Sequence, residues 1–294
     1  MFPAPLAAAL FALSTSAFFG AFSILVRLGR DHANAITGVI ISLLAPLPFF
    51  ILATASMWDP AWWNLKSIGF FVLAGAAGPA CSRVFLYLSL HYLGVARAMP
   101  LASVTPLFST LLAIAVLGES PGPHIWAGTL LIVAGSAALS YKKPSDKSWS
   151  RRHLWLIFLS VLASAWSFLF RKLALTEVNA PVMGVTVSSL TGLLLLFLYR
   201  PIMPAAERPR FPNRKAWAFY GACGLLNGAG FLTQFYALGL GDISIVIPLS
   251  STAPFFSLLL SRLLLRGTER VTGWIVAGTV LIVGGAALIS WRLR

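Results

Sequence analysis

The segment PLASVTPLFSTLL at Pro100–Leu112 returns later in the chain as PLSSTAPFFSLLL at Pro248–Leu260. A second pair follows in the same order, since AGTLLIVAGSAALS at Ala127–Ser140 matches AGTVLIVGGAALIS at Ala277–Ser290. The prolines and glycines of each pair agree in register, which a shared apolar composition alone does not explain. Such self-similarity indicates that the chain contains two copies of one structural unit.

Composition places both copies in a membrane. Of the 294 residues, 58% are hydrophobic and 10% are charged, and the mean hydropathy is +0.85. A soluble domain carries roughly 25% charged residues, so this chain has too few charges to cover a water-exposed surface. Because about 20 apolar residues in a helix cross the hydrocarbon core, we predict ten such helices, near 5–26, 35–56, 67–91, 95–117, 123–141, 153–174, 181–200, 216–239, 243–265 and 270–291.

The ten helices divide into two halves of five, a first repeat at 1–141 and a second at 153–294. The polar, basic segment KKPSDKSWSRR at 142–152 is typical of a linker between them. Because five is odd, the second half must enter the membrane from the opposite side. We therefore predict an all-α membrane protein of ten transmembrane helices, arranged as two inverted five-helix repeats like those of many transporters.

The positive charge of the chain, +14 net, is concentrated in alternate loops. The odd-numbered loops hold sixteen Lys and Arg residues, and the even-numbered loops hold three, namely Lys66, Arg171 and Lys172. Short basic loops remain in the cytoplasm, so we expect a multi-pass protein of the inner (plasma) membrane with both termini on the outer face. Charges placed in this way indicate a membrane protein rather than a protein that binds nucleic acid.

No motif points to a metal, a cofactor or an enzyme. Cys81 and Cys223 both lie in apolar runs, which supports neither a disulfide framework nor a metal site. No HExxH motif, paired intramembrane aspartate, Ser-His set or glycine-rich phosphate loop occurs at a useful spacing. We therefore predict no cofactor and no enzymatic activity, and we assign no oligomeric state.

The repeated helices resemble a known transporter family. A helix of the form PLxSxxPLFxxLLAxxxLGE, followed by one of the form AGxxLIxxGxxL and repeated in the second half, is similar to the ten-helix EamA-type members of the drug/metabolite transporter superfamily. The resemblance covers nearly the full chain and implies a central cavity between the halves and alternating access. The chain departs from the family at Phe19-Gly20, where members often have Trp-Gly, and Glu269 echoes Glu119 only after a two-residue shift. Trp166 occupies the equivalent place in the sixth helix, and we include it among the candidate substrate-binding residues.

Arg83 is the clearest candidate for substrate binding. It lies well inside the third span, with Tyr87 one turn further along the same face. A charge near the bilayer centre is costly unless it faces a cavity or a partner, and a guanidinium binds a carboxylate or a phosphate through two parallel hydrogen bonds. We expect Arg83 to bind an anionic group and Tyr87 to stack or hydrogen-bond beside it. The alternative is a structural arginine, bonded to helix carbonyls or snorkelling toward the cytoplasmic face.

The other candidates come from the eighth, fourth and ninth helices. The repeat places Phe231 at the position of Arg83, so the two halves differ chemically. Paired prolines interrupt the fourth and ninth helices at corresponding places, which points to a binding site in transporters with inverted repeats. The candidate side chains near these features are Asn227, Gln234, Tyr236, Ser103 and Ser251. The alternatives are hydrogen bonding between helices for the amides and ordinary kinking for the prolines.

These features together predict an alternating-access transporter that exports small metabolites such as amino acids or organic anions and that contacts membrane lipid. We expect its cavity to be bounded by the first, third, fourth, sixth, eighth and ninth helices, with the fifth and tenth outside. The alternatives are a flippase or scramblase for an anionic lipid and a facilitator or exchanger of phosphorylated metabolites. All acidic residues fall in loops or at span ends, whereas a proton-coupled exporter of drug cations needs a carboxylate within the membrane.

Overall fold

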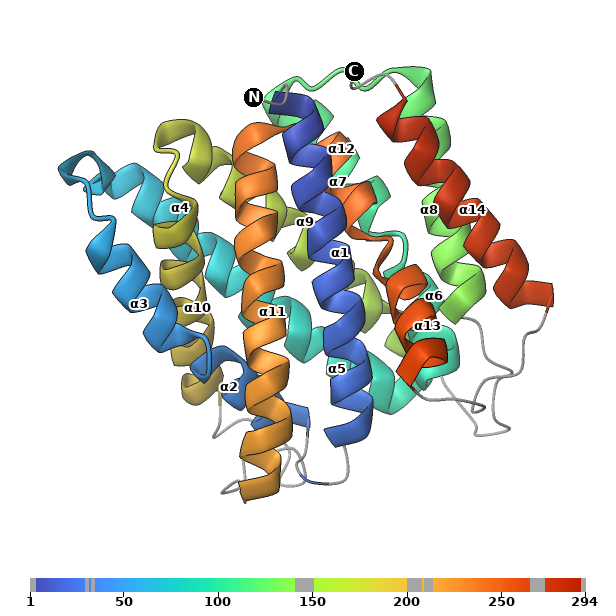
Figure 1. The fold of residues 1–294 in the computed structure, drawn as a ribbon, viewed down its shortest axis with the longest axis horizontal. Coiled ribbons are helices and arrows are strands. Elements are labelled where there is room, and N and C mark those ends of the chain that lie inside the picture. The colour runs from blue at the N-terminus through green and yellow to red at the C-terminus, as the bar shows by residue number, and fades with distance from the viewer. Residues whose placement is uncertain are drawn as a thin grey trace.

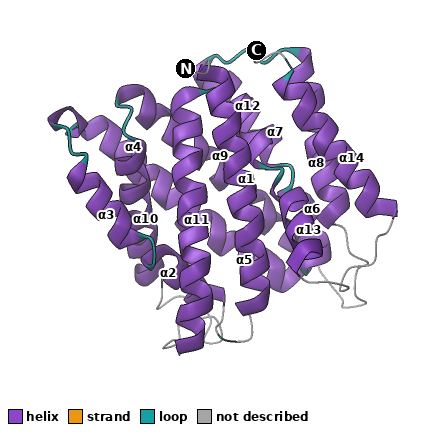
Figure 2. Cartoon of the chain, in the orientation of Figure 1, coloured by secondary structure: helices purple, strands orange, loops and turns teal. Residues whose placement is uncertain are grey.

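The structure, a computed structural model, describes residues 4–29, 32, 35–140, 151–199, 208, 214–264 and 273–291. Every regular element in these ranges is a helix, and the helices pack side by side in a bundle that is more than one helix deep (Figures 1 and 2). Nine segments of the described chain are long and apolar enough to cross a membrane. The predicted all-α membrane fold is therefore confirmed.

The remaining predicted crossing is α11 (Arg214–Leu240), whose 27 residues are long enough to span but less apolar than the other nine. Asn227, Gln234 and five glycines lower its hydrophobicity. The helix nevertheless lies beside α1 (Ala4–Gly29) and runs the full height of the bundle (Figure 1). With α11 included, the described part of the chain makes ten crossings.

The first half makes five crossings, and three of them are interrupted. Proline accompanies each interruption, because it lacks a backbone N–H and its ring clashes with the preceding helical turn. After α1, the elements are α2 (Ala35–Leu44), α3 (Leu47–Ser56), a 3-10 turn (Pro60–Trp62), α4 (Leu65–Gly75), a π-helical turn (Ala76–Ser82), α5 (Arg83–Leu93), α6 (Val95–Ala102), α7 (Thr105–Leu112), a second π-helical turn (Ala113–Leu117) and α8 (Pro123–Ser140).

The second half repeats this plan with fewer interruptions. The fourth crossing breaks at Ser103–Val104 and the ninth at Ser251–Thr252, two places that correspond in the repeat, so the predicted interruptions are present. The elements are a 3-10 turn (Arg151–His153), α9 (Leu154–Glu177), α10 (Pro181–Leu198), α11, α12 (Ile243–Ser250), α13 (Ala253–Leu264) and α14 (Gly273–Ser290).

The shortest connection in the described chain is the single residue Gly94 between α5 and α6. Its φ of 75° lies in the left-handed region, where a side chain would be strained. Glycine at this position therefore lets the third and fourth crossings follow each other without a loop.

The fifth and tenth crossings, α8 and α14, show that the repeats are inverted. A Cβ on Gly128 would lie 2.7 Å from the carbonyl oxygen of Gly285, and one on Gly135 would lie 2.7 Å from that of Gly278, so the helices run antiparallel in close contact. In the sequence repeat Gly128 corresponds to Gly278, and Gly135 corresponds to Gly285. If the two halves are exchanged, the contact between Gly128 and Gly285 therefore becomes the contact between Gly278 and Gly135. A twofold axis perpendicular to the helices produces this relation, as two inverted repeats require.

The two halves are interlocked rather than stacked. The helix α1 packs against α11 and α13, and α4 packs against α9. Hydrogen bonds cross the same boundary, between the hydroxyls of Thr15 and Thr233 at 2.9 Å and from the backbone N–H of Ile243 to Glu119 Oε1 at 2.8 Å. The centre of the bundle is therefore built from both halves.

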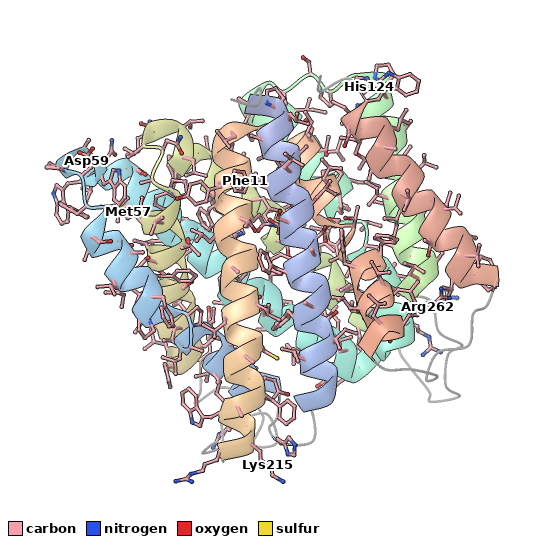
Figure 3. The ribbon with its side chains drawn as sticks, in the orientation of Figure 1. Phe11, Met57, Asp59, His124, Lys215 and Arg262 are labelled. Carbon is pink, nitrogen blue, oxygen red and sulfur yellow. The ribbon has the colours of Figure 1, made fainter. Side chains whose placement is uncertain are left out.

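The two edges of this bundle carry different ionisable side chains. The helix α1 begins and α14 ends at the same edge, as an even number of crossings requires (Figure 1). Lys215 and Arg262 lie toward the opposite edge, whereas Asp59 and His124 lie on the side of the two helix ends (Figure 3). This arrangement agrees with the charge pattern that the loops show in the sequence.

Two charges that we assigned to an even-numbered loop lie elsewhere. Arg171 is inside α9 and only 2% exposed, and Lys172 Nζ donates to the carbonyl oxygens of Leu238 and Gly241 at 3.0 and 2.8 Å. The assignment was wrong because both residues lie within the sixth span itself, whose helix α9 continues to Glu177. The even-numbered loops are therefore less basic than the sequence count suggests.

Candidate functional site

A cavity of about 350 Å³ lies between the two halves. Its described wall comes from α1 and the third crossing in the first half, and from α9 and α11 in the second half. No described residue of α8 or α14 lines it, as we expected for the fifth and tenth crossings. The described residues of the fourth and ninth crossings do not line it either, which corrects our expectation for these two helices. The lining residues are Phe19, Phe22, Ser23, Gly78, Pro79, Arg83, Ser164, Ser167, Phe168, Arg171, Asn227, Phe231 and Gln234.

Arg171 brings a buried positive charge to this cavity. Its Nη1 donates to Oε1 of Gln234 at 2.7 Å, while its Nε is buried without a hydrogen-bond partner. The guanidinium carbon lies 5.0, 5.1 and 5.5 Å from the ring centres of Phe235, Phe231 and Phe168. Aromatic faces attract cations at such distances, so the rings hold the guanidinium in place without neutralising it.

Sequence reasoning missed Arg171 as a site residue, although a signal for it is present. Ser160, Ser164, Ser167 and Arg171 are spaced by four, three and four residues, so they share one face of a helix. A polar face within an apolar span indicates a surface turned toward the protein interior. The sixth span therefore carries its arginine at the end of a buried polar stripe.

Arg83 lies on the opposite half and faces the same aromatic ring. Its guanidinium carbon is 5.5 Å from the centre of the Phe231 ring, and that of Arg171 is 5.1 Å from the same centre. In the sequence repeat Arg83 corresponds to Phe231 and Arg171 corresponds to Ser23, and all four residues line the cavity. The repeat thus supplies two pairs of equivalent positions around one cavity, with one arginine in each pair.

The π-helical turn Ala76–Ser82 attaches the third crossing to α9. Pro79 lies inside this turn, and π-helical turns occur frequently at functional sites. Ser82 Oγ donates to the carbonyl oxygen of Ser160 at 3.1 Å, and Ser160 Oγ donates to that of Ser82 at 2.9 Å. This reciprocal pair fixes the register of the two halves next to the cavity.

Gly78 makes room for the side chains of α9. A Cβ at this position would lie 2.4 Å from Ser167 Oγ and 3.3 Å from Arg171 Nη2. Ser167 Oγ in turn donates to the carbonyl oxygen of Ala74 at 2.8 Å. The absence of a side chain at Gly78 therefore lets Arg171 and Ser167 reach the third crossing.

The two amides that we predicted on α11 both line the cavity. Gln234 accepts the hydrogen bond from Arg171, and Asn227, two turns earlier on the same face, is 3% exposed. The Nδ2 of Asn227 is buried with no hydrogen-bond partner. Because a buried donor without a partner is costly, this amide is available to donate a hydrogen bond to a ligand.

Two predicted aromatic residues lie outside the cavity wall. Trp166 is 40% exposed, and its ring centre is 5.5 Å from that of Phe170 on the same helix. Tyr236 stacks on Phe11 of α1 with ring centres 5.5 Å apart, toward the edge where α1 begins (Figure 3). Neither residue is among those that line the cavity.

The two predicted serines also lie outside the cavity wall. The hydroxyls of Ser103 and Ser251 donate to carbonyls four residues earlier in their own helices, at 3.1 and 2.8 Å. The carbonyl oxygen of Ser251 accepts from Ser136 Oγ of α8 at 3.3 Å. A carbonyl that the helix break frees therefore binds a neighbouring helix instead of facing the cavity. The backbone of Tyr87 belongs to α5, but its side chain lies outside the described residues.

Comparisons with known proteins agree with this architecture. The model of the EamA-like transporter family matches the chain twice, at residues 6–141 and 151–291. A relative from a Sinorhizobium species, described as an uncharacterized transporter in the cobO 3' region, is 25% identical over 148 residues, which make up 49% of this chain and 98% of the relative. A solved structure described as "Crystal structure of protein" shares the fold, with a TM-score of 0.80 at 19% identity over 98% of this chain and 97% of that chain. Since the family model covers both halves, the chain belongs to the EamA-like transporter family of the drug/metabolite transporter superfamily.

Proposed function

We propose that this transporter exports small metabolites that carry a negatively charged group, such as amino acids or organic anions. The observation that supports the proposal is the charge of the cavity. Arg83 and Arg171 both line it, and none of its described lining residues is acidic. A positively charged cavity within the membrane attracts anions and repels cations.

Each kind of side chain in the cavity wall has a specific role in binding the ligand. Arg83 binds a carboxylate through two parallel hydrogen bonds, and the unpartnered Nδ2 of Asn227 donates a further hydrogen bond to the ligand. Phe19, Phe22 and Phe231 cover the apolar part of the ligand. Such a mixture of aromatic surface and a few polar groups suits a small metabolite better than a bare inorganic ion.

Transport follows from the inverted arrangement of the halves. In transporters with inverted repeats, one half moves against the other around a fixed central site. Here the cavity wall comes from two crossings of each half, so a relative movement of the halves opens it to one side and closes it to the other. We place the protein in the inner membrane with both termini outside, because the odd-numbered loops are basic.

A lipid flippase is the second candidate, and one observation favours it. A hollow of about 230 Å³ lies between α6 and α9, on the boundary between the halves. Its described lining is wholly apolar and consists of Leu101, Val104, Leu154, Ile157, Phe158 and Val161. An acyl chain fits such a surface, while the headgroup of an anionic lipid would need the arginines of the cavity.

Reconstituted protein distinguishes these two functions. Liposomes that contain the purified chain should release labelled amino acids or organic anions faster than empty liposomes, without faster flipping of a fluorescent anionic lipid. Arg83→Met should abolish the release, and Arg83→Lys should reduce it, because lysine keeps the charge but lacks the planar fork. Arg262→Met, at an exposed position on α13 outside the cavity, serves as the control. Lipid flipping without anion release would overturn the proposal.

A further inference from the structure

We infer that the ligand of the cavity carries two negative charges, one for each arginine, as a phosphomonoester or a small dicarboxylate does. This inference rests on the proposed function and narrows the class of substrate. It depends on Arg171, which the sequence did not mark as a binding residue.

The first step is the charge state of Arg171. A guanidinium is not deprotonated in proteins, so its positive charge persists even at 2% exposure. The side-chain hydrogen bond of its Nη1 goes to the neutral amide of Gln234, and its Nε has no hydrogen-bond partner. The described surroundings thus orient this charge with an amide and three phenyl rings, none of which supplies a negative charge.

The second step is the position of Arg83. Its guanidinium carbon lies 5.5 Å from the centre of the Phe231 ring, and that of Arg171 lies 5.1 Å from the same centre. The distance between the two guanidinium carbons therefore cannot exceed the sum of these two distances. Like charges at such range repel each other, and more so in a protein interior than in bulk water. A ligand with one negative charge compensates one arginine, whereas a dianion attracts both and also relieves their mutual repulsion.

The third step is the geometry of the ligand. Phosphate oxygens and carboxylates both accept two parallel hydrogen bonds from a guanidinium. A volume of about 350 Å³ is at the small end for ligand sites. The two arginines come from opposite halves, so the two charges of the ligand must lie at one end of a compact molecule or be separated by a few bonds.

A single substitution tests the role of charge while leaving Arg171 in place. Gln234→Glu changes the acceptor of the 2.7 Å hydrogen bond from an amide to a carboxylate of nearly the same shape. The new carboxylate would neutralise Arg171 from within the protein. The cavity would then have one positive charge fewer than in the wild type, as it also has in Arg83→Gln, where the charge is removed from the other half.

The experiment compares matched ligands on the purified full-length chain at about 150 mM salt, where surface charges are screened. Succinate is paired with its monoamide, and glycerol phosphate with its methyl diester, at pH 7.5, where the phosphomonoester is mostly doubly charged. Apparent affinities come from the ligand-induced rise in melting temperature and are checked by uptake into liposomes. The two pairs also distinguish a dicarboxylate from a phosphomonoester as the ligand.

We expect at least one dianion to bind the wild-type protein roughly tenfold or more tightly than its singly charged partner. In Gln234→Glu and in Arg83→Gln this preference should fall to within about threefold, with the monoanion still bound. Arg171→Gln should behave in the same way if it folds, and Arg262→Gln should keep the wild-type preference.

The possible failures are distinguishable. If the wild-type protein transports anions but binds both members of each pair equally, the inference is wrong and the proposed function stands. If the preference for dianions persists in Gln234→Glu and in Arg83→Gln, the arginines do not determine it, and the inference is also wrong. If no anion binds or moves at all, the proposed function fails together with the inference.

Discussion

Gly78 offers a quantitative test of how closely the third crossing and α9 must approach each other. In Gly78→Ala the new Cβ would lie 2.4 Å from Ser167 Oγ, 3.1 Å from Ser167 Cβ and 3.3 Å from Arg171 Nη2. A separation of 2.4 Å is too short for any stable contact, so Ser167 must rotate or α9 must move away. In either case the hydrogen bond from Ser167 to the carbonyl of Ala74 is weakened.

The expected loss of stability is about 2 kcal/mol. Overpacking of a well-filled interior costs about 1–3 kcal/mol, and a hydrogen bond between membrane helices contributes about 0.6 kcal/mol. Replacing glycine by alanine within a helix offsets part of this, by about 0.5–1 kcal/mol. A loss of 2 kcal/mol lowers the melting temperature of the purified protein by about 5 °C. Transport of the anionic substrate should fall roughly tenfold, because Arg171 is displaced from its position.

Two further variants show whether this reasoning is correct. Gly69→Ala, on the preceding helix α4, has no atom within 4 Å of the new Cβ and should match the wild type in stability and transport. Ser167→Gly removes both of the closest atoms, so the double variant Gly78→Ala/Ser167→Gly should regain part of the lost transport. If Gly78→Ala equals the wild type in both measurements, or if the double variant is no better than the single one, the close contact does not position Arg171.

Three other substitutions or fusions test separate parts of the structure. Gly135→Leu should prevent α8 and α14 from packing, because its Cβ would lie 2.7 Å from the carbonyl oxygen of Gly278, whereas Gly284→Leu, with open space around it, should leave the melting temperature nearly unchanged. Glu119→Gln should lower the melting temperature by a few degrees, equivalent to about 1 kcal/mol, because the carboxylate accepts from the first N–H groups of α12 at 2.8 and 3.0 Å. A reporter that is active only outside the cytoplasm should be active when fused after Arg294, and activity of a cytoplasmic reporter at that place would contradict the orientation.

The architecture was predictable because the sequence repeat and the apolar runs each extend over many residues, so a few exceptions do not obscure the pattern. The glycines of the repeated segments at 127–140 and 277–290 agree in register, and the structure places those of α8 directly against those of α14. The interruptions of the fourth and ninth crossings were predictable for a similar reason, since proline cannot continue a helical hydrogen-bond ladder. Helix ends were less predictable, since α9 continues to Glu177, three residues beyond the predicted end of the sixth span, and Arg171 was counted with the adjoining loop although it lies inside that span.

The site was only partly predictable, because the direction of a side chain depends on tertiary contacts. Arg83, Asn227 and Gln234 line the cavity, and each is strongly polar within an otherwise apolar span. Ser103 and Ser251 were selected because proline frees nearby carbonyls, but a serine in a helix satisfies its hydroxyl within its own helix. Sequence shows which groups need a partner and leaves open whether the partner is a ligand or the protein itself.

The difference between the two halves at the cavity follows from the symmetry of the fold. Residues 83 and 231 are equivalent in the repeat, and their side chains touch across the boundary between the halves, so they lie close to the twofold axis. If both were arginine, two permanent positive charges would meet at the axis, which is unfavourable. A phenyl ring at 231 removes that repulsion and attracts the guanidinium of Arg83 instead. The second arginine belongs to the other pair of equivalent positions, residues 23 and 171. It stands at 171, where Gln234 and two further rings hold it. The repeated scaffold therefore determines where the cavity lies, while differences between the two halves give it one arginine from each half without placing two arginines at equivalent positions.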